Sequence, residues 1–255
     1  MRIFWIMIIL SQILFIGVVN SSITVHASPD NGSLESGSPK YIWFSGYEWK
    51  VKSGHYAPGK NEWRADNAWV DIDGYLHLKI TQQAGNWYCA EVTSLKPFGY
   101  GVYQFQVISQ IEKLDPNMVF GLFVYPSEEK ESNKDNEIDI EFAQWGKLDA
   151  PRGNYTVTPD VYSFPFSLEG NYTVHQFTWD SQQVQFQSFH GHMPAKKTEF
   201  SNYLYIPSDY GKIAPVPPVR VHMNFWLFLG DAPLDNEERE VVIRSFKFIP
   251  YTLSK

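Results

Sequence analysis

Apolar and polar residues alternate along much of the chain after Tyr41, and no long segment repeats with the helical period of 3.6 residues. Alternation with a period of two places successive side chains on opposite faces of a strand. The pattern predicts strands over residues 68–72, 75–80, 88–94, 101–108, 119–125, 136–142, 154–158, 172–179, 183–190, 219–228 and 240–249. Glycine, proline and asparagine separate these segments, and residues 71–74 (Asp-Ile-Asp-Gly) predict a hairpin turn. Short strands without an internal repeat favour an all-β sandwich or barrel.

One predicted strand, 136–142, has carboxylates on its polar face. Glu137, Asp139 and Glu141 alternate with apolar residues, so the three acidic side chains share one side. Three like charges side by side repel one another and do not help folding. Retaining glycosidases need two carboxyl groups about 5–5.5 Å apart, one as nucleophile and one as general acid/base. The alternative is an exposed strand whose acidic face is simply solvated.

The first 27 residues have the pattern of a secretory signal peptide. Arg2 precedes an apolar run over residues 3–19, and Val25, His26 and Ala27 resemble a cleavage site. We therefore expect export through the N-terminal signal, to the extracellular space or the cell envelope, with an uncleaved anchor as the alternative. Residues 28–40, rich in serine, glycine and proline, predict a flexible linker, and residues 41–255 predict one domain. No membrane contact is expected after cleavage.

Composition narrows the range of partners and cofactors. Without Arg2 the mature chain has 20 basic against 28 acidic residues, which argues against nucleic acid as a partner. Cys89 is the single cysteine, so the predicted monomer has no internal disulfide, and we expect a buried, inert thiol. His190 and His192 flank a glycine without an obvious third ligand, so an exposed turn is expected and no metal site. An aromatic content of 16% suits a sandwich core and platforms for sugar rings.

Beyond the acidic strand, further segments resemble glycoside hydrolase family 16, a group of β-jelly-roll proteins that includes lichenases and laminarinases. They occur in the family's order at 61–67 (Asn-Glu-Trp-Arg-Ala-Asp-Asn), 89–91 (Cys-Ala-Glu), 98–103 (Phe-Gly-Tyr-Gly-Val-Tyr), 177–180 (Phe-Thr-Trp-Asp) and 223–226 (Met-Asn-Phe-Trp). The resemblance implies a concanavalin A-like jelly roll of two antiparallel sheets, in which the concave sheet forms a glycan cleft.

The resemblance also implies roles for individual residues. Glu137 matches the nucleophile, Asp139 an assisting carboxylate and Glu141 the general acid/base. The matched substrate-binding positions are Glu91, Asn224 and Trp226, together with Asn154 and Tyr155, whose alignment needs a shift of one residue. Trp145 lies four residues after Glu141, and we expect it to border the cleft. No metal or organic cofactor is needed for chemistry of this kind.

Four positions depart from the family pattern. Thr93 stands where lichenases have an arginine, and Asp135 stands where they have a tryptophan. Cys89 matches one half of the family disulfide, whereas Asn61 stands at the other half. Ser245 replaces the aspartate of a calcium site found in some members, so no calcium is expected. The loss of the arginine and the tryptophan indicates different sugar subsites.

The sequence thus predicts an exported retaining glycoside hydrolase that cleaves β-glycosidic bonds in a β-glucan-like polysaccharide. A transglycosylase on the same fold is a close alternative, because only the acceptor differs. A non-catalytic, lectin-like carbohydrate-binding protein is the alternative of a different class. Its support is the loss of subsite residues, and the retention of all three carboxylates argues against it.

Overall fold

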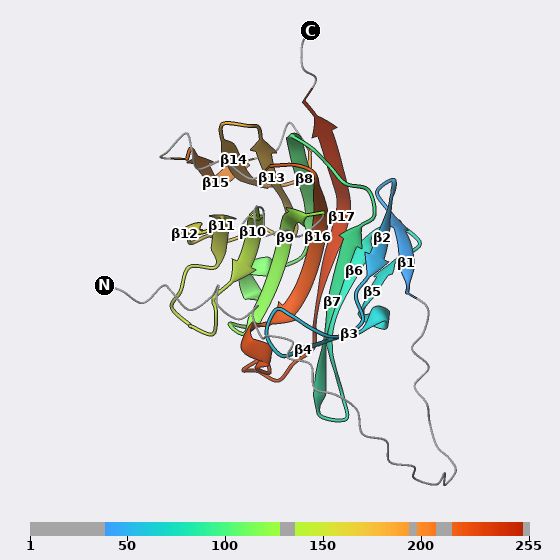
Figure 1. Cartoon of the computed structure of the whole chain (residues 1–255). Helices are drawn as coiled ribbons and strands as arrows, with labels where there is room; N and C mark the ends of the chain where they lie inside the picture. Colours follow the sequence, from blue (N-terminus) through green and yellow to red (C-terminus); the bar gives the residue numbers. More distant parts are fainter. Residues whose placement is uncertain (1–38, 128–135, 194–197, 208–215, 252–255) are drawn as a thin grey trace, which may run out of the picture. The chain divides into compact units, whose positions relative to one another are not determined.

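The computed structural model describes residues 39–127, 136–193, 198–207 and 216–251 and arranges their strands in two antiparallel sheets (Figure 1). The first sheet has the order β12 (Asp160–Phe164), β11 (Gly153–Val157), β10 (Ile138–Ala143), β9 (Met118–Pro126), β16 (Val219–Leu227), β7 (Asn86–Ser94), β2 (Tyr47–Val51) and β1 (Tyr41–Phe44). The second sheet has the order β15 (Thr198–Tyr205), β14 (Val184–His190), β13 (Tyr172–Trp179), β8 (Gly101–Ile108), β17 (Arg239–Pro250), β6 (Leu76–Gln83) and β5 (Ala68–Val70).

The two sheets are connected at one end by hydrogen bonds between their strands. The ends of β6 and β7 pair antiparallel, while β4 (Asn61–Trp63) pairs parallel with β7 and antiparallel with β3 (Gly54–Tyr56). Short 3₁₀ turns occupy Ala65–Asn67, Ile111–Lys113 and Phe228–Gly230. The all-β prediction is therefore confirmed for the described residues.

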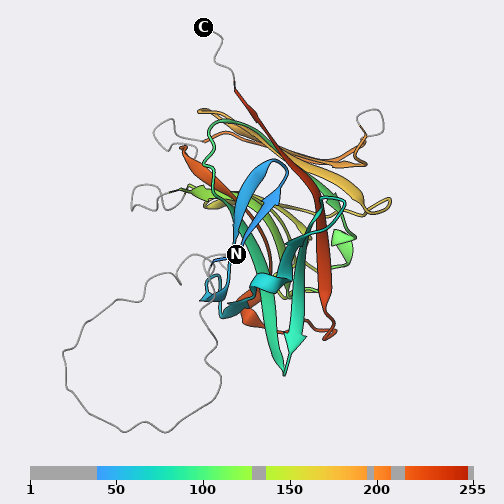
Figure 2. The same cartoon turned by 90° about the vertical axis from the view of Figure 1, so that its right-hand side faces the viewer.

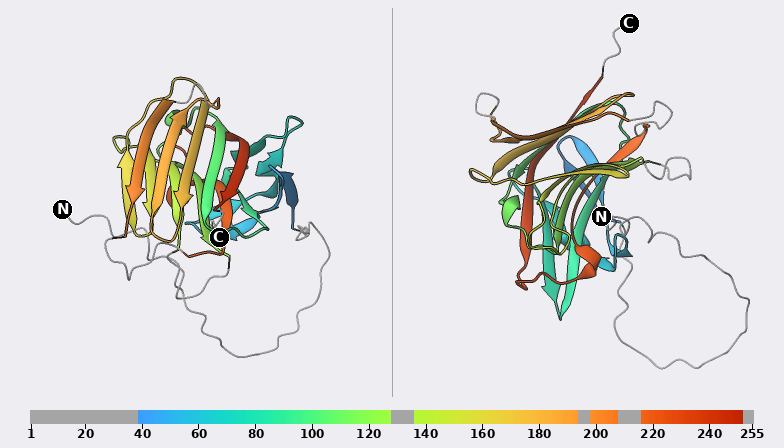
Figure 3. Two further views of the ribbon diagram at one scale, coloured as in Figure 1. Left: turned by 90° about the horizontal axis from the view of Figure 1, so that it is seen from above. Right: turned by 90° about the vertical axis from the view of Figure 1, so that its left-hand side faces the viewer.

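The core lies between the two layers of strands, which are seen edge-on in Figure 2 and from two further sides in Figure 3. Each sheet turns its apolar row inward, as the alternation of the sequence predicts. Aromatic rings meet across the layers: Tyr155 of β11 stacks on Phe186 of β14 with centroids 4.8 Å apart, and Phe142 of β10 contacts His175 of β13 at 4.6 Å. The inner face of β10 is thus anchored in the core.

Each predicted strand falls on an observed one, although the ends differ by a few residues. The hairpin at 71–74 is also present, with the Gly74 amide donating to the Asp71 carbonyl at 3.1 Å and a φ of +81° at Gly74. The predicted signal segment (1–27) and most of the predicted linker (28–40) lie outside the described residues. In the part of the chain that is described, no helix is long and apolar enough to cross a membrane.

Candidate active site

The acidic strand is built as the alternation predicts. On β10, Ile138, Ile140 and Phe142 are at most 1% exposed and face the core, whereas Asp139 and Glu141 lie on the outer face. Glu137 directly precedes the strand and forms a hydrogen bond with Asp139. The three carboxylates, which we call the acidic strand face, therefore form one group on the side of the first sheet that turns away from the core.

A row of residues crosses the sheet at the level of Glu141. In the antiparallel pairings Glu141 lies opposite Asn154 on β11 and Gly121 on β9, while Asn224 on β16 lies opposite Gly121 and Glu91 on β7. Residues directly opposite one another in an antiparallel pair share a face. This cross-strand row (Asn154, Glu141, Gly121, Asn224 and Glu91) brings predicted site residues together from four strands, although up to 133 positions separate them in the chain.

Gly121 makes room for the Asn224 side chain in the middle of this row. A Cβ atom at position 121 would lie 2.4 Å from Asn224 Oδ1, much closer than van der Waals contact. Asn224 is only 4% exposed, and its Oδ1 has no hydrogen-bond partner among the described residues. A buried amide oxygen without a partner costs free energy, so its retention next to Glu141 points to a function.

The environment of the acidic strand face favours protonated carboxyls. Burial, followed by the charge of Glu137, raises the pKa of Glu141 to about 8. Burial raises the pKa of Asp139 well above its usual value, and the charges of Glu137 and Glu141 and the hydrogen bond to Glu137 add to the rise. Glu141 therefore holds a proton at neutral pH, and Asp139 donates its proton toward Glu137. A protonated acid beside a charged carboxylate is the pairing that acid-assisted displacement requires.

Glu91, at the other end of the row, has the opposite environment. Lys52 donates to Glu91 Oε2 at 2.8 Å, and His222 Nδ1 lies 3.3 Å from Oε1. Burial raises the pKa of Glu91, but the hydrogen bonds and charges of His222 and Lys52 outweigh it, so the pKa lies below its usual value. The Lys52 ammonium also lies 4.0 Å from the centre of the Trp63 ring. Glu91 is thus a buried, ionised and paired carboxylate.

The other predicted binding residues have differing positions. Trp226 is 6% exposed on the outer face, two residues beyond Asn224. Asn154 is 1% exposed, and its amide is engaged by the chain itself, donating to the Ala143 carbonyl at 3.2 Å and accepting from Ser163 Oγ at 2.7 Å. The Asn154 side chain therefore stabilises the end of the cross-strand row through internal hydrogen bonds, and these bonds occupy the polar groups that a ligand would need.

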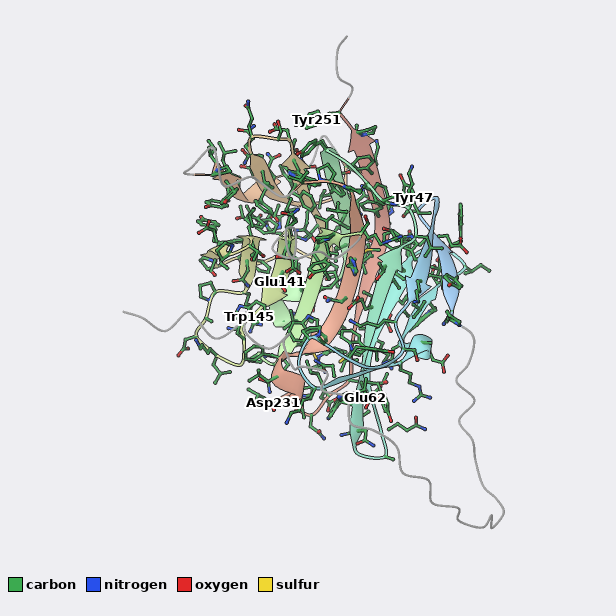
Figure 4. All side chains as sticks on the ribbon, viewed as in Figure 1. Tyr47, Glu62, Glu141, Trp145, Asp231 and Tyr251 are labelled. Carbon is green, nitrogen blue, oxygen red and sulfur yellow. The ribbon has the colours of Figure 1, made fainter. Side chains whose placement is uncertain are left out.

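Tyr155 does not lie where a cleft residue would. It alternates with Asn154 along β11, so its ring points into the core, where it is fully buried and donates to Ser188 Oγ at 2.7 Å. The structure therefore separates Tyr155 from the acidic strand face, and a direct contact with substrate is not supported. Trp145, labelled in Figure 4, follows the end of β10 with a φ of +54°. Its half-buried ring packs edge-on against Phe228.

Two site residues were not predicted from the sequence. Phe123 of β9 and His222 of β16 lie opposite Asp139 and Thr93 respectively, and their rings stack with centroids 4.8 Å apart. Phe123 belongs to a nearly continuous apolar run, which gives no face preference. His222 lies two residues from both Arg220 and Asn224, so the three side chains share one face of the strand. This period of two is the sequence signal that could have placed His222 on the same face as Asn224.

Two of the family departures have structural counterparts. Cys89 is fully buried, and its Sγ donates to Asn61 Oδ1 at 3.2 Å, so a hydrogen bond connects the two positions. Burial raises the pKa of the Cys89 thiol to about 12, which makes the group unreactive. Thr93 bonds His222 Nδ1 at 3.1 Å. Asp135 lies outside the described residues.

The remaining sequence predictions concern surface histidines and calcium. His190 and His192 flank Gly191, and His192 Nε2 lies within 3.0 Å of the carbonyls of Val107 and Thr173, which accounts for its position without a metal. Ser245 lies on β17 opposite Gln106 of β8. Neither the His190–His192 segment nor Ser245 has a feature that indicates a metal ion.

Comparisons with known proteins agree with the resemblance seen in the sequence. A β-glucanase of Paenibacillus polymyxa is 27% identical over 218 residues, covering 82% of each chain. A β-glucanase of Paenibacillus macerans is 28% identical over 191 residues, covering 72% of this chain and 73% of the relative. No family model matches the chain.

Solved structures share the fold. The β-glucanase of Bacillus licheniformis superimposes with a TM-score of 0.60 at 19% identity, covering 85% of this chain and 100% of its own. A glycoside hydrolase family 16 endo-glucanase from Bacteroides ovatus gives 0.56 at 14% identity, covering 79% and 94%. The jelly-roll prediction is therefore confirmed, and so is the predicted resemblance to glycoside hydrolase family 16.

Proposed function

We propose that this protein is a retaining glycoside hydrolase that cleaves β-glucan. The glycosidase class is supported by the β-glucanase relatives and by the family 16 neighbours. The observation that supports the retaining mechanism most directly is the acidic strand face. There, the Glu141 carboxyl has a pKa of about 8 and lies close to the charged Glu137 carboxylate. Without such chemistry, a repulsive group of three carboxylates would only destabilise the sheet.

In the first step the Glu141 carboxyl transfers its proton to the glycosidic oxygen as the bond to the anomeric carbon breaks. The Glu137 carboxylate attacks the anomeric carbon and forms a glycosyl ester. Glu141, now ionised, then accepts a proton from water, whose oxygen displaces Glu137 from the sugar. Asp139 acts through its hydrogen bond to Glu137. This bond holds the attacking carboxylate in place, and it can form again once Glu137 is released after each turnover.

The substrate and the location follow from different observations. β-Glucan is proposed because both relatives are β-glucanases, and because Asn224 in the cross-strand row and Trp226 two residues further on carry groups suited to hydroxyls and sugar rings. Export is proposed from the apolar segment after Arg2, and the polysaccharide is then met outside the cell. A monomer is sufficient for this chemistry, because Glu137, Asp139 and Glu141 all come from one segment of one chain, at and just before β10.

The test is a polysaccharide panel with the purified protein and its Glu137→Gln variant. Mixed-linkage β-glucan, laminarin, galactan and xyloglucan are incubated with each, and new reducing ends are measured. We expect release from a β-glucan by the wild type and at least a thousandfold less by the variant. Equal, trace release by both proteins would refute catalysis by Glu137. Binding without release would favour the lectin-like function, and product elongation with an added acceptor sugar would favour the transglycosylase.

A further inference from the structure

A cluster beside the acidic strand face is not used by the proposed chemistry. It consists of Lys52, Glu91, Thr93, Phe123 and His222, which we call the histidine cluster. Thr93 lies opposite His222 on the neighbouring strand, and His222 lies opposite Phe123, which in turn lies opposite Asp139. The cluster thus extends over the outer face of β9, β16 and β7, with Phe123 one strand away from Asp139, His222 two strands and Thr93 three.

The hydrogen bonds of the cluster fix the orientation of the His222 ring. Its Nδ1 lies 3.1 Å from Thr93 Oγ1 and 3.3 Å from Glu91 Oε1. Since the Lys52 ammonium donates to the other carboxylate oxygen at 2.8 Å, Glu91 is ionised and acts as an acceptor. Nδ1 must then carry the hydrogen, so that Nε2 is an acceptor whenever the ring is neutral.

Packing limits the ring further and leaves its other nitrogen free. Phe123 stacks on one face with an interplanar angle of 21°, and Tyr125 approaches with its edge. The His222 side chain keeps 15% of its surface exposed. Among the described residues, Nε2 has no hydrogen-bond partner. One nitrogen of the ring is fixed by hydrogen bonds and the other has no partner in this part of the chain. The ring is therefore preorganised for a ligand, because folding has already fixed its orientation and binding need not do so.

We propose that His222 is a specificity-determining residue that accepts a hydrogen bond from a sugar hydroxyl through Nε2, a role that rests on the proposed β-glucan hydrolase. Thr93 and Glu91 are its positioning residues, and Phe123 offers the apolar wall beside it. The position agrees with the departure at Thr93, because the threonine leaves space that a long arginine would fill. The histidine cluster would therefore form a sugar subsite of a composition particular to this chain.

The experiment separates a contact through Nε2 from a structural role through Nδ1. Asparagine places a polar atom near the position of Nδ1, whereas glutamine reaches the position of Nε2. His222→Ala, His222→Asn and His222→Gln are each made in the full chain carrying Glu137→Gln, which prevents turnover. Calorimetry then measures binding of a mixed-linkage β-gluco-tetrasaccharide. His190→Ala, on the second sheet, is the matched control.

We expect the alanine and asparagine variants to bind about tenfold more weakly, a loss typical of one hydrogen bond to a ligand. The glutamine variant should recover most of the affinity, and the control should bind like the parent. Recovery by asparagine and not by glutamine would overturn the proposal, as would equal affinities or no binding by the parent. If the wild-type protein released no reducing ends but binding still depended on His222, the hydrolase would be refuted and the proposed subsite would remain supported.

Discussion

Glu91 and Glu141 occupy the two sides of one cross-strand row, and they differ in almost everything except their residue type. Both are largely withdrawn from water on the outer face of the first sheet, with Gly121 and Asn224 between them. Glu91 has Lys52 and His222 as partners, and its pKa is lowered. Glu141 has Asp139 and Glu137 nearby, and its pKa is raised to about 8. Opposite neighbours thus give two glutamates opposite protonation states at neutral pH.

The difference separates a group that stabilises the fold from a group that is kept for chemistry. A compensated carboxylate can stay ionised in a buried place and orient its neighbours. An uncompensated one keeps its proton and can release it to a leaving group. The cost in stability is expected at Glu141 and not at Glu91, so the two positions should respond in opposite directions when each is replaced by glutamine.

The largest effect expected from breaking this contrast is on turnover. Glu141→Gln removes the transferable proton, and kcat on β-glucan should fall about a thousandfold, within the range of general acid catalysis. An aryl β-glucoside with an acidic phenol as leaving group needs no proton, so its first step should be affected much less. In the wild type, activity should decline as the pH rises through about 8, because Glu141 then loses its proton. Burst kinetics of phenol release, steady-state kinetics on β-glucan and the pH profile measure these effects.

The matched control is Glu169→Gln, which changes an exposed glutamate in the connection between β12 and β13. It should keep the activity of the wild type. If Glu141→Gln slowed the first release of phenol from the activated glucoside as much as it slowed β-glucan hydrolysis, or if the alkaline decline were absent, Glu141 would not be the acid.

The sequence predicted the acidic side of this contrast well, because it depends on local alternation. Glu137, Asp139 and Glu141 share a face by the period of a strand alone. The compensated side depends on pairing between β7 and β16, and His222 and Thr93 meet although they are 129 positions apart. Local patterns contain no information about such a register, so Glu91 was predicted only through the family resemblance and His222 was missed.

Tyr155 illustrates the same limit from the opposite direction. Because side chains alternate along a strand, Asn154 and Tyr155 must face opposite sides of the sheet. Which of the two faces the core is decided by the pairing of β11 with β10, and the sequence does not show that pairing. The edge strands β12 and β15 were also missed. β12 is exposed over most of its length and β15 has only exposed and half-buried positions, so neither has the buried apolar row that marks a half-buried strand.

Measurements of stability should sharpen the contrast, since the two replacements by glutamine are expected to change the free energy of unfolding in opposite directions. Glu91 has a lowered pKa in the folded protein, so its contribution is present at pH 7 and is lost as the pH falls through that pKa. Glu91→Gln leaves Lys52 uncompensated and should destabilise by about 2 kcal/mol at pH 7. Glu141 has a raised pKa, so the wild type loses stability as the pH rises from about 4.5 to 8. Glu141→Gln should therefore stabilise by about 2 kcal/mol at pH 7.

Urea unfolding at pH 4.5 and pH 7 measures both effects. For Glu141→Gln the difference from the wild type should become small at pH 4.5, where the unfolded glutamate is about half protonated. For Glu91→Gln the difference should change little between pH 7 and pH 4.5, because the lowered pKa of Glu91 in the folded protein lies below that pH. Equal destabilisation by the two variants would contradict the assignment of opposite environments.

The smallest expected effect comes from the residue between the two glutamates. Gly121→Ala places a methyl group 2.4 Å from the present position of Asn224 Oδ1, so the buried amide must move. We expect a destabilisation of about 1–2 kcal/mol, typical of overpacking, and a decrease of about tenfold in kcat/KM. Gly99→Ala is the control, because a Cβ atom there meets nothing within 4 Å. Its stability and activity should match the wild type. If Gly121→Ala lost stability but kept kcat/KM, the position of Asn224 would matter for packing alone, and the contrast between Glu91 and Glu141 would not extend to the residues between them.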